Sequence, residues 1–370
     1  MRMKRYLVVI GTRPEAIKMC PLILAMRRAG MAHRVVLTGQ HREMADEVLA
    51  FFGVQADVNL DVMRKGQTLP ALTERLLGAM RRELARDADY TACLVHGDTA
   101  TAFAAALSCF YAGIPVVHVE AGLRSGDVRA PFPEELYRRA VDAMSTLWLA
   151  PTERAVSHLF AEGAVASRVY TVGNTATDAV RLCLERAVSH PLLDDAKECR
   201  TVLLTAHRRE MDERSRYAML SAIRRNIEGR SDVLLVMPVH PSPAVRATAN
   251  AAFAGCANAC LTAPLPLPLM QHLLARTTLL LTDSGGLQEE ATYLGVPTLV
   301  LRERTERPEG VEAGVLSAVG TDPLRVGREL AALLDDGARL TRMRRPSTVY
   351  GDGYVSERIV RILAQTGSVG

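Results

Sequence analysis

The chain has 370 residues, of which 48% are hydrophobic and 23% charged, and this ordinary globular composition excludes intrinsic disorder. Lys and Arg (45) exceed Asp and Glu (41) by a net charge of +4, which is too small for a nucleic-acid-binding surface but compatible with a small anionic ligand. At roughly 150 residues per domain, the length predicts two domains.

The first half of the chain alternates short apolar runs with amphipathic stretches of helical length. We expect strands at residues 6–10, 34–38, 91–96, 116–119, 146–150 and 169–172, and helices at 15–29, 42–52, 68–86 and 99–112. Alternation of strands and helices indicates βαβ units, and therefore a parallel sheet with helices on both faces.

The second half repeats this pattern, with strands expected at 201–205, 233–237, 278–282, 298–301 and 314–319, and helices at 214–226 and 287–294. The two series predict an α/β protein of two doubly wound, Rossmann-like domains, 1–173 and 174–352. The polar residues 189–197 fit a linker or a loop within the second domain. Residues 353–370 read as a final helix, which can cross back to pack on the N-terminal domain.

The seven cysteines are scattered and form no CxxC motif, so we expect reduced thiols in a cytoplasmic protein and no metal site. The apolar run 6–10 is shorter than the ~7–15 residues of a signal-peptide core. The apolar stretch 101–119 is divided by Gly113 and Pro115, whereas a membrane span needs about 20 apolar residues in one helix. These features predict no membrane partner.

The loop after the first strand carries Arg13 and Lys18 at a predicted helix start, where backbone N–H groups and the helix dipole favour an anion. Ligands of doubly wound sheets bind at such strand ends. The same residues also fit an ordinary glycine turn with a solvated arginine. The loop is neither a GxGxxG fingerprint nor a P-loop, so it does not support NAD binding or ATP cleavage.

A second loop, after the strand expected at 278–282, contains Ser284, Gly285 and Gly286. The glycines allow close approach of the backbone to a ligand, and the serine hydroxyl can donate to a phosphate oxygen. Glu290, one turn into the following helix, can accept hydrogen bonds from ribose hydroxyls. The alternative is a glycine-rich turn in which Asp283 or Ser284 caps the helix.

Carboxylates occupy similar positions in the first domain. Asp98 lies between a strand and a helix, Glu120 follows the strand 116–119, and Glu134 and Glu135 open a helix. A purely structural role at a helix start fits Asp98, Glu134 and Glu135, but it fits Glu120 less well, because Glu120 opens a loop. Three carboxylates in one cleft can divide the roles of general acid and general base.

Basic residues follow two strands of the second domain. His207 and Arg208 lie in a cluster that can meet a diphosphate held between the domains, although a solvated basic turn is the alternative. His240 ends the next strand, and Arg307 follows the strand at 298–301. On spacing alone, these loops predict a two-domain enzyme or binder that closes on a phosphorylated ligand.

Together, these motifs resemble those of the non-hydrolysing UDP-N-acetylglucosamine 2-epimerases. The matching segments run almost from end to end of the chain: GTRPEAIK (11–18), TGQH (38–41), HGDT (96–99), HVEAGLRS (118–125), PFPEE (131–135), GNTATDA (173–179), LTAHRRE (204–210), PVHP (238–241), DSGGLQEEA (283–291), TERPEGVEAG (305–314) and YGDG (350–353).

The resemblance implies a glycosyltransferase-B-like fold with the ligand cleft between the two domains. It implies interconversion of UDP-GlcNAc and UDP-ManNAc, by elimination of UDP to 2-acetamidoglucal and re-addition of UDP. The product would supply surface polysaccharide precursors. The family needs no cofactor and no metal, and its members form homodimers.

The resemblance also assigns roles to residues, without saying which carboxylate is the base. The catalytic set is Asp98, Glu120, Glu134 and His207. The substrate-binding set is Arg13 and Lys18 near the phosphates, Ser284, Gly285 and Gly286 on the diphosphate, Glu290 on the ribose, and Arg307 on the substrate side.

Some family members are activated by UDP-GlcNAc in a second pocket, and the matching positions here are Gln40, Glu43, Glu134, Arg208 and His240. The chain also departs from the family at several positions. Gly66 stands where such members often carry Arg, and residues 263–270 replace the loop that holds the uracil, with Leu265 and Met270 at its contact points. Tyr137 replaces Asn, Thr292 replaces Pro, and Glu303 and Arg304 alter the loop before residue 305.

Three alternatives remain open. A hydrolysing epimerase would release ManNAc and UDP, but the intact motifs at 11–15 and 118–124 favour the non-hydrolysing type. A glycosyltransferase of the same fold would not need three acid–base carboxylates in one domain. A regulator that only binds nucleotide sugars would not need the intact catalytic set.

Overall fold

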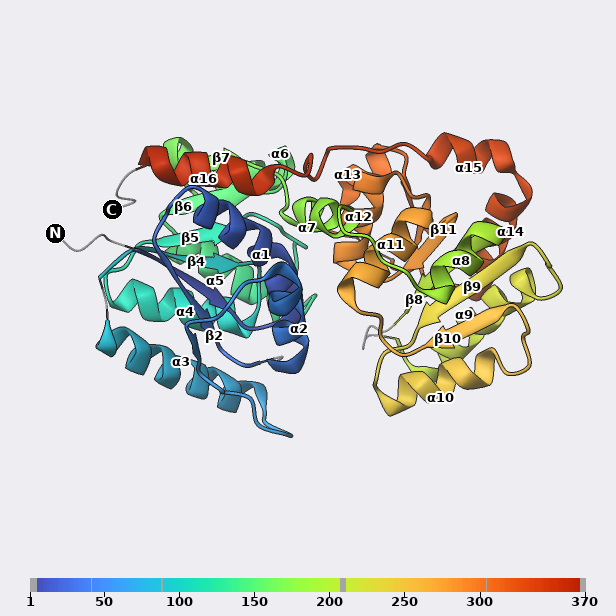
Figure 1. The fold of residues 1–370 in the computed structure, drawn as a ribbon, viewed down its shortest axis with the longest axis horizontal. Helices are drawn as coiled ribbons and strands as arrows, with labels where there is room; N and C mark the ends of the chain where they lie inside the picture. The colour runs from blue at the N-terminus through green and yellow to red at the C-terminus, as the bar shows by residue number, and fades with distance from the viewer. Residues whose placement is uncertain (1–4, 41, 88, 207–210, 304, 367–370) are drawn as a thin grey trace. The chain divides into compact units, whose positions relative to one another are not determined.

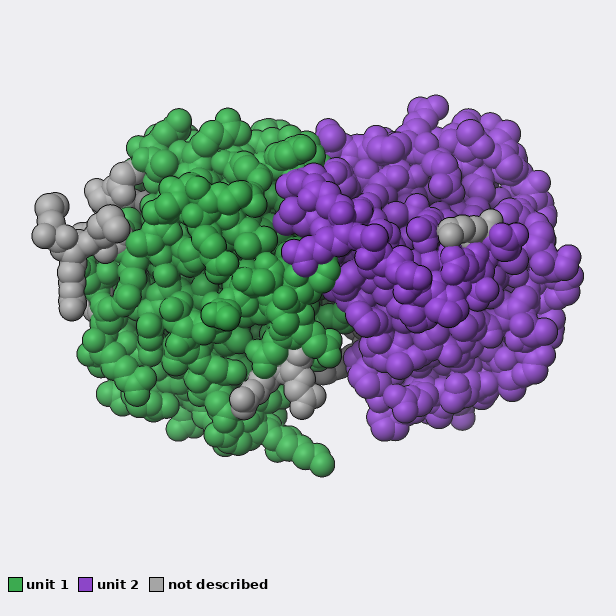
Figure 2. Space-filling model, in the orientation of Figure 1, with its two compact units in different colours: residues 1–179, 351–370 green, residues 180–350 purple. Residues whose placement is uncertain are grey.

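The computed structural model describes residues 5–40, 42–87, 89–206, 211–303 and 305–366. The chain divides into two compact units, Met1–Ala179 with Gly351–Gly370, and Val180–Tyr350 (Figure 2). The division therefore falls between Ala179 and Val180 rather than directly after Gly173.

The first unit contains a seven-stranded parallel sheet in the order β3-β2-β1-β4-β5-β6-β7. Its strands are β1 (Arg5–Ile10), β2 (His33–Leu37), β3 (Val58–Asn59), β4 (Tyr90–His96), β5 (Val116–Val119), β6 (Leu147–Ala150) and β7 (Val169–Thr171). The chain moves outward from β1 through β2 to β3 and then returns to β4 on the other side. Ligands of doubly wound sheets bind at this reversal, next to the loops after β1 and β4.

Helices follow most strands of this unit (Figure 1). They are α1 (Arg13–Arg28), α2 (Arg42–Phe52), α3 (Leu69–Arg86), α4 (Ala100–Tyr111), α5 (Glu134–Met144), α6 (Glu153–Ala161), η1 (Ala166–Arg168), α7 (Ala176–Leu184), which crosses the division, and α16 (Val355–Thr366). The returning helix α16 packs beside α1, and the Tyr6 hydroxyl donates to the Leu363 carbonyl oxygen at 3.3 Å.

The second unit contains a six-stranded parallel sheet in the order β10-β9-β8-β11-β12-β13. Its strands are β8 (Arg200–Thr205), β9 (Val233–Pro238), β10 (Ala259–Thr262), β11 (Leu279–Thr282), β12 (Thr298–Val300) and β13 (Leu316–Ala318). Its helices are α8 (Pro191–Glu198), α9 (Glu213–Ile227), α10 (Pro243–Ala252), α11 (Leu267–Arg276), α12 (Gly285–Leu294), α13 (Pro308–Glu312), α14 (Pro323–Asp335) and α15 (Gly337–Met343). The strand order reverses between β8 and β11.

Two edge strands were not predicted from the sequence, and a stretch predicted as a linker or loop is a helix. The strands β3 and β10 are short and only partly buried, because each lies at a sheet edge, so neither has the apolar run that marks an inner strand. The helix α8 occupies the stretch predicted as a linker or loop. Pro191 begins that helix, and Leu193 packs in the core against Leu273 of α11.

The described part of the chain has no helix long and apolar enough to cross a membrane. Nor does it hold three or more His, Cys, Asp or Glu side chains placed to bind a metal ion. Five of the seven cysteines are buried, and all seven are free thiols.

Candidate functional site

Glu15 shapes the loop after β1. Thr12 caps α1, and one Glu15 oxygen accepts hydrogen bonds from the backbone N–H groups of Gly11 (3.0 Å) and Thr12 (2.6 Å). The other oxygen accepts from the hydroxyl of Thr99 at 2.8 Å, which ties this loop to the start of α4. Burial raises the pKa of Glu15, while these hydrogen bonds lower it. Arg13, the first residue of α1, is thereby held at the switch point of the sheet.

Glu15 was not predicted as a residue that shapes the site. Its signal was present, because Thr12 and Glu15 have the spacing of a capping box.

Glu120 lies directly after β5, and the structure brings it together with Lys18. The Lys18 ammonium and the Asn174 side-chain amide both contact Oε2 of Glu120, and Nε2 of His96 lies 3.5 Å from the same oxygen. Glu120 is 8% exposed and has a φ of +69°, which is rare for a residue with a side chain. His96 and Asn174 were not predicted as site residues, because the residues next to them in the sequence do not indicate that they contact Glu120.

Asp98 follows β4 and pairs with Arg138 of α5. Because β4 and β5 are neighbours in the sheet, the loops that carry Asp98 and Glu120 start side by side. The two adjacent acids of α5 differ. Glu135 is fully buried and binds Arg139 at 3.0 Å and the backbone N–H of Ser125 at 3.0 Å, whereas the first residue of α5, Glu134, is partly exposed.

A buried ion network supports this edge of the sheet. His118 Nδ1 lies 2.6 Å from Asp142, and its Nε2 lies 2.8 Å from the carbonyl oxygen of Gly97. Arg124 binds the other Asp142 oxygen at 2.8 Å. Burial opposes ionisation of Asp142, but His118 and Arg124 outweigh it and lower its pKa. The network holds Gly97, the residue between His96 and Asp98.

In the second unit, Ser284 caps α12 with its hydroxyl, as the structural alternative for this loop predicted. Arg307 lies against the start of the same helix, since a Cβ added to Gly285 would come within 2.6 Å of its guanidinium. Arg307 is fixed by Glu289 at 2.6 Å. Backbone N–H groups, a glycine and a guanidinium therefore meet at one helix N-terminus, an arrangement that suits an oxyanion of a phosphate.

Glu290 is buried one turn into α12 and accepts a hydrogen bond from Gln271 of α11 at 2.8 Å. Leu265, just before α11, and Met270, within α11, are both partly buried against the core that also holds Ala291. The departure from the family at 263–270 is thus adjacent to the residue expected to hold the ribose.

The remaining predicted residues are His207 and the group predicted to bind the activating UDP-GlcNAc. His207 and Arg208 lie outside the described residues, as does the side chain of Glu43. Gln40 accepts a hydrogen bond from Thr101 at 3.0 Å, beside the loop after β1. His240 is exposed at the end of β9.

Two further departures from the family have structural roles. Tyr137 is buried and stacks on Phe103, with the ring centroids 5.1 Å apart. Thr292 is also buried and donates its hydroxyl to a carbonyl oxygen one turn earlier in α12 at 2.7 Å.

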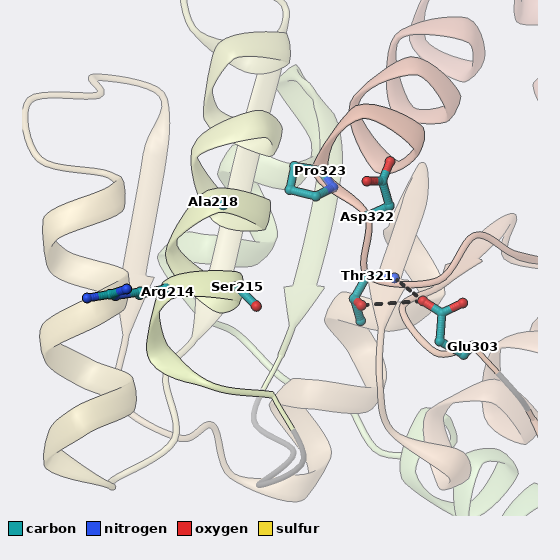
Figure 3. Close-up of a pocket in the computed structure, with 7 residues that line it drawn as sticks. All are labelled: Arg214, Ser215, Ala218, Glu303, Thr321, Asp322 and Pro323. Carbon is teal, nitrogen blue, oxygen red and sulfur yellow. Dashed lines mark hydrogen bonds between the residues drawn. The ribbon is translucent and has the colours of Figure 1, made fainter.

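A hollow of about 460 Å³ on the second unit lies between α9 and the loop that leads into α14 (Figure 3). Arg214 and Ser215 line one side, and Glu303 and Asp322 line the other. Glu303 accepts a hydrogen bond from the backbone N–H of Thr321 at 3.1 Å. Among the described residues, none of those predicted to bind substrate lines this hollow.

Comparison with known proteins identifies a close set of relatives. Residues 24–364 match a family model described as UDP-N-acetylglucosamine 2-epimerase. The chain is 43% identical to UDP-N-acetylglucosamine 2-epimerase of Bacillus subtilis, over 98% of this chain and 96% of that protein. It is 39% identical to the Escherichia coli K12 enzyme of the same name, over 97% and 98%.

Solved structures agree. The S. aureus MnaA–UDP co-structure is 40% identical with a TM-score of 0.92, covering 98% of this chain and 97% of that one. The Neisseria meningitidis UDP-GlcNAc 2-epimerase bound to UDP-GlcNAc is 35% identical with a TM-score of 0.91, covering 98% and 100%. These matches confirm the predicted glycosyltransferase-B-like fold of two parallel-sheet domains.

Proposed function

Because the chain belongs to the UDP-N-acetylglucosamine 2-epimerase family, we propose that it interconverts UDP-GlcNAc and UDP-ManNAc without net hydrolysis. The observation that carries the proposal is the buried Glu120 carboxylate after β5, the neighbour of β4, where Lys18 and Asn174 hold it. The nearby cation and amide favour the ionised carboxylate, which is the form that can accept a proton.

The proposed reaction starts when one carboxylate removes the C2 proton. The electron pair of the C–H bond forms the C1–C2 double bond of 2-acetamidoglucal, and UDP leaves with the electron pair of the C1–O bond. A proton then returns to C2 on the opposite face, and a UDP oxygen adds back to C1. Glu120, Asp98 and Glu134 are the candidate acids and bases, and which of them removes the proton stays open.

Departure of UDP requires positively charged protein groups next to the diphosphate, because negative charge builds up there as the C1–O bond breaks. We propose that Arg307 and the N-terminus of α12, which lie together, supply this charge. In this proposal Ser284, Gly285 and Gly286 bind the phosphate oxygens and Glu290 binds the ribose. His207, Arg208, Arg13 and Lys18 complete the proposed set. The C2 proton is only weakly acidic, so stabilising the leaving group is as necessary as the base.

Incubation with UDP-GlcNAc in D2O, without an acceptor, tests the proposal by NMR at C2. We expect deuterium at C2 together with UDP-ManNAc. Free ManNAc and UDP would indicate the hydrolysing type, and an unchanged sugar would indicate a transferase or a binding protein.

The carboxylate assignment has its own test. We expect Asp98→Asn and Glu120→Gln to lower turnover by ~10²-fold or more while the fold stays intact. The exposed Glu74 on α3 provides a matched control, since Glu74→Gln removes a carboxylate that is not among the predicted site residues. Near-full activity of both site variants would contradict the assignment.

We also propose that UDP-GlcNAc activates the enzyme through Gln40, Glu43, Arg208 and His240. Addition of UDP-GlcNAc to a reaction started from UDP-ManNAc tests the activation. A hyperbolic dependence of the rate on UDP-ManNAc, without a lag before UDP-GlcNAc is added, would contradict it.

We further propose that the protein is a homodimer located in the cytoplasm. Light scattering tests the dimer, for which the exposed aromatic residues Phe110 and Tyr111 at the end of α4 offer apolar surface.

A further inference from the structure

We infer that Asn174 is a positioning residue for the Glu120 carboxylate, and that the C-terminal return of the chain holds Asn174 in place. The inference rests on the proposed catalytic role of Glu120. It also gives a role to two motifs that the reaction leaves without one, at residues 173–179 and 350–353.

Glu120 needs external support. Its φ of +69° lies in the left-handed region, which a side chain disfavours and which persists only where surrounding contacts impose it. The backbone N–H of Glu120 donates to the Leu149 carbonyl oxygen at 3.0 Å, and this hydrogen bond fixes the main chain at Glu120. The side chain is then fixed through Oε2, by the Lys18 ammonium and the Asn174 amide.

The orientation of the Asn174 amide is determined by its second contact. Its Oδ1 accepts a hydrogen bond from the backbone N–H of Ala176 at 3.0 Å, so the NH2 group must face Glu120. Asn174 is 2% exposed, and an amide flip would place two oxygens against each other inside the protein. Asn174 therefore donates to Glu120 in one fixed orientation. An oxygen in place of its NH2 group would remove this donor and disfavour the ionised form of Glu120.

The C-terminal segment fixes the Asn174 loop from the other side. The hydroxyl of Thr177 donates to the Asn174 carbonyl oxygen at 3.0 Å and accepts from the backbone N–H of Gly353 at 3.2 Å. Gly351 has a φ of +134°, and a Cβ there would lie 2.6 Å from the Thr177 hydroxyl and 3.2 Å from the Asn174 carbonyl oxygen. Only glycine permits this close approach.

Asp178 completes the attachment. Its carboxylate oxygens accept from the backbone N–H groups of Val355 at 3.0 Å and Ser356 at 2.6 Å, at the start of α16. Figure 1 shows the chain running from α15 back to α16, which ends near the N-terminal strand of the first unit. The last helix thus anchors residues 174–178, and through Asn174 it reaches the carboxylate.

The decisive variant is Asn174→Ala. We expect it to lower kcat by about 10-fold or more, since a hydrogen bond to a charged group is lost, while KM for UDP-GlcNAc and the Kd of UDP change less than about two-fold. The pH profile adds a readout that simple loss of structure would not move. The charged and titratable groups in described contact with Glu120 are Lys18 from α1 and His96 from β4.

Loss of the Asn174 donor makes the neutral form of the Glu120 carboxyl group more stable relative to the ionised form. The limb of the pH–rate profile that reports ionisation of Glu120 therefore moves to higher pH. This direction holds whether Glu120 acts as base or as acid. Asn174→Asp, which places a second carboxylate against Glu120, should move that limb further. Asn226→Ala removes an amide of the second unit that donates to the Ala222 carbonyl oxygen within its own helix, and it should leave kcat and the profile unchanged.

A double variant separates this inference from the proposed function. If Asn174 acts through Glu120, Asn174→Ala should cause no further loss in the Glu120→Gln background. An equal loss in both backgrounds, or full activity of Asn174→Ala beside an inactive Glu120→Gln, would overturn the inference and leave the catalytic role of Glu120 intact. Near-full activity of Glu120→Gln would instead refute that catalytic role.

If Asn174→Ala fails to fold, Thr177→Val tests the same link with the amide retained. Removal of the hydroxyl releases the Asn174 carbonyl from Gly353, so we expect a smaller fall in kcat and a shift of the same limb to higher pH. A Thr177→Val enzyme with lower thermal stability but an unchanged pH profile would overturn the link.

Discussion

Replacing Tyr350 by Phe removes one hydroxyl from the interior of the second unit and keeps the ring. Tyr350 is 2% exposed, donates to the Arg307 carbonyl oxygen at 2.9 Å and accepts from the backbone N–H of Gly310 at 2.9 Å. Burial raises the pKa of Tyr350 above its ordinary value, so the hydroxyl remains a donor at neutral pH.

The magnitude follows from these contacts. Two hydrogen bonds of about 1 kcal/mol each are lost, and the buried N–H of Gly310 loses the hydroxyl oxygen that accepts from it, so the free energy of unfolding should fall by roughly 2–3 kcal/mol. For a unit of this size each kcal/mol moves the Tm by about 2–4 °C. We therefore expect Tyr350→Phe to lower the Tm of the second unit by about 6 °C.

Calorimetry of the whole chain measures this change. Tyr217→Phe is the matched control, because the Tyr217 ring is 48% exposed on α9 of the same unit. Since Tyr350 fixes the backbone of Arg307, the Kd of UDP should also rise several-fold. Equal Tm values for the two variants would refute the reasoning.

Three further predictions follow. Gly122→Ala should lower the Tm of the first unit much more than Gly126→Ala, because both have positive φ but only the Cβ at Gly122 meets a backbone oxygen, at 2.3 Å. Gly285→Ala should weaken UDP binding about 10-fold in calorimetric titration with little change in Tm, since its Cβ displaces the Arg307 guanidinium. The lowered pKa of Asp142 contributes stability that is present above about pH 4 and lost as the pH falls through the lower folded value. A series of Tm values from pH 7 to pH 3 should therefore show a shallower acid loss for Asp142→Asn, and an unchanged slope would contradict this.

The inner strands were predictable because strands buried on both faces need continuous apolar runs. Residues 116–119 are an example, since β5 has the predicted bounds. The edge strand β3 has two residues, one of them Asn59, and a strand with one free edge needs no such run. The helix α8 was missed because residues 189–197 are mostly polar and fit a linker or loop, whereas Pro191 begins a helix there.

For the candidate site, the sequence indicated Glu120 through its place after a strand, and the family motifs indicated Lys18. The identity of the contacts could not be obtained in this way. Asn174 and Glu120 are 54 residues apart, and their contact depends on how β5 and the loop after β7 are placed around the sheet. The separation of Glu134 from the buried Glu135 likewise depends on the packing of α5.

The sequence by itself therefore determined the class of fold and the chemical types at the strand ends, because hydrophobic periodicity and helix caps act over a few residues. The net charge of +4 is compatible with a small anionic ligand, and the residues expected to bind that ligand include Lys18 and Arg307. Only the tertiary structure decided which cation holds a carboxylate and which lies at a helix N-terminus. Such contacts join residues distant in the chain, and burial makes them strong, because removal from water leaves each charge dependent on its protein partners.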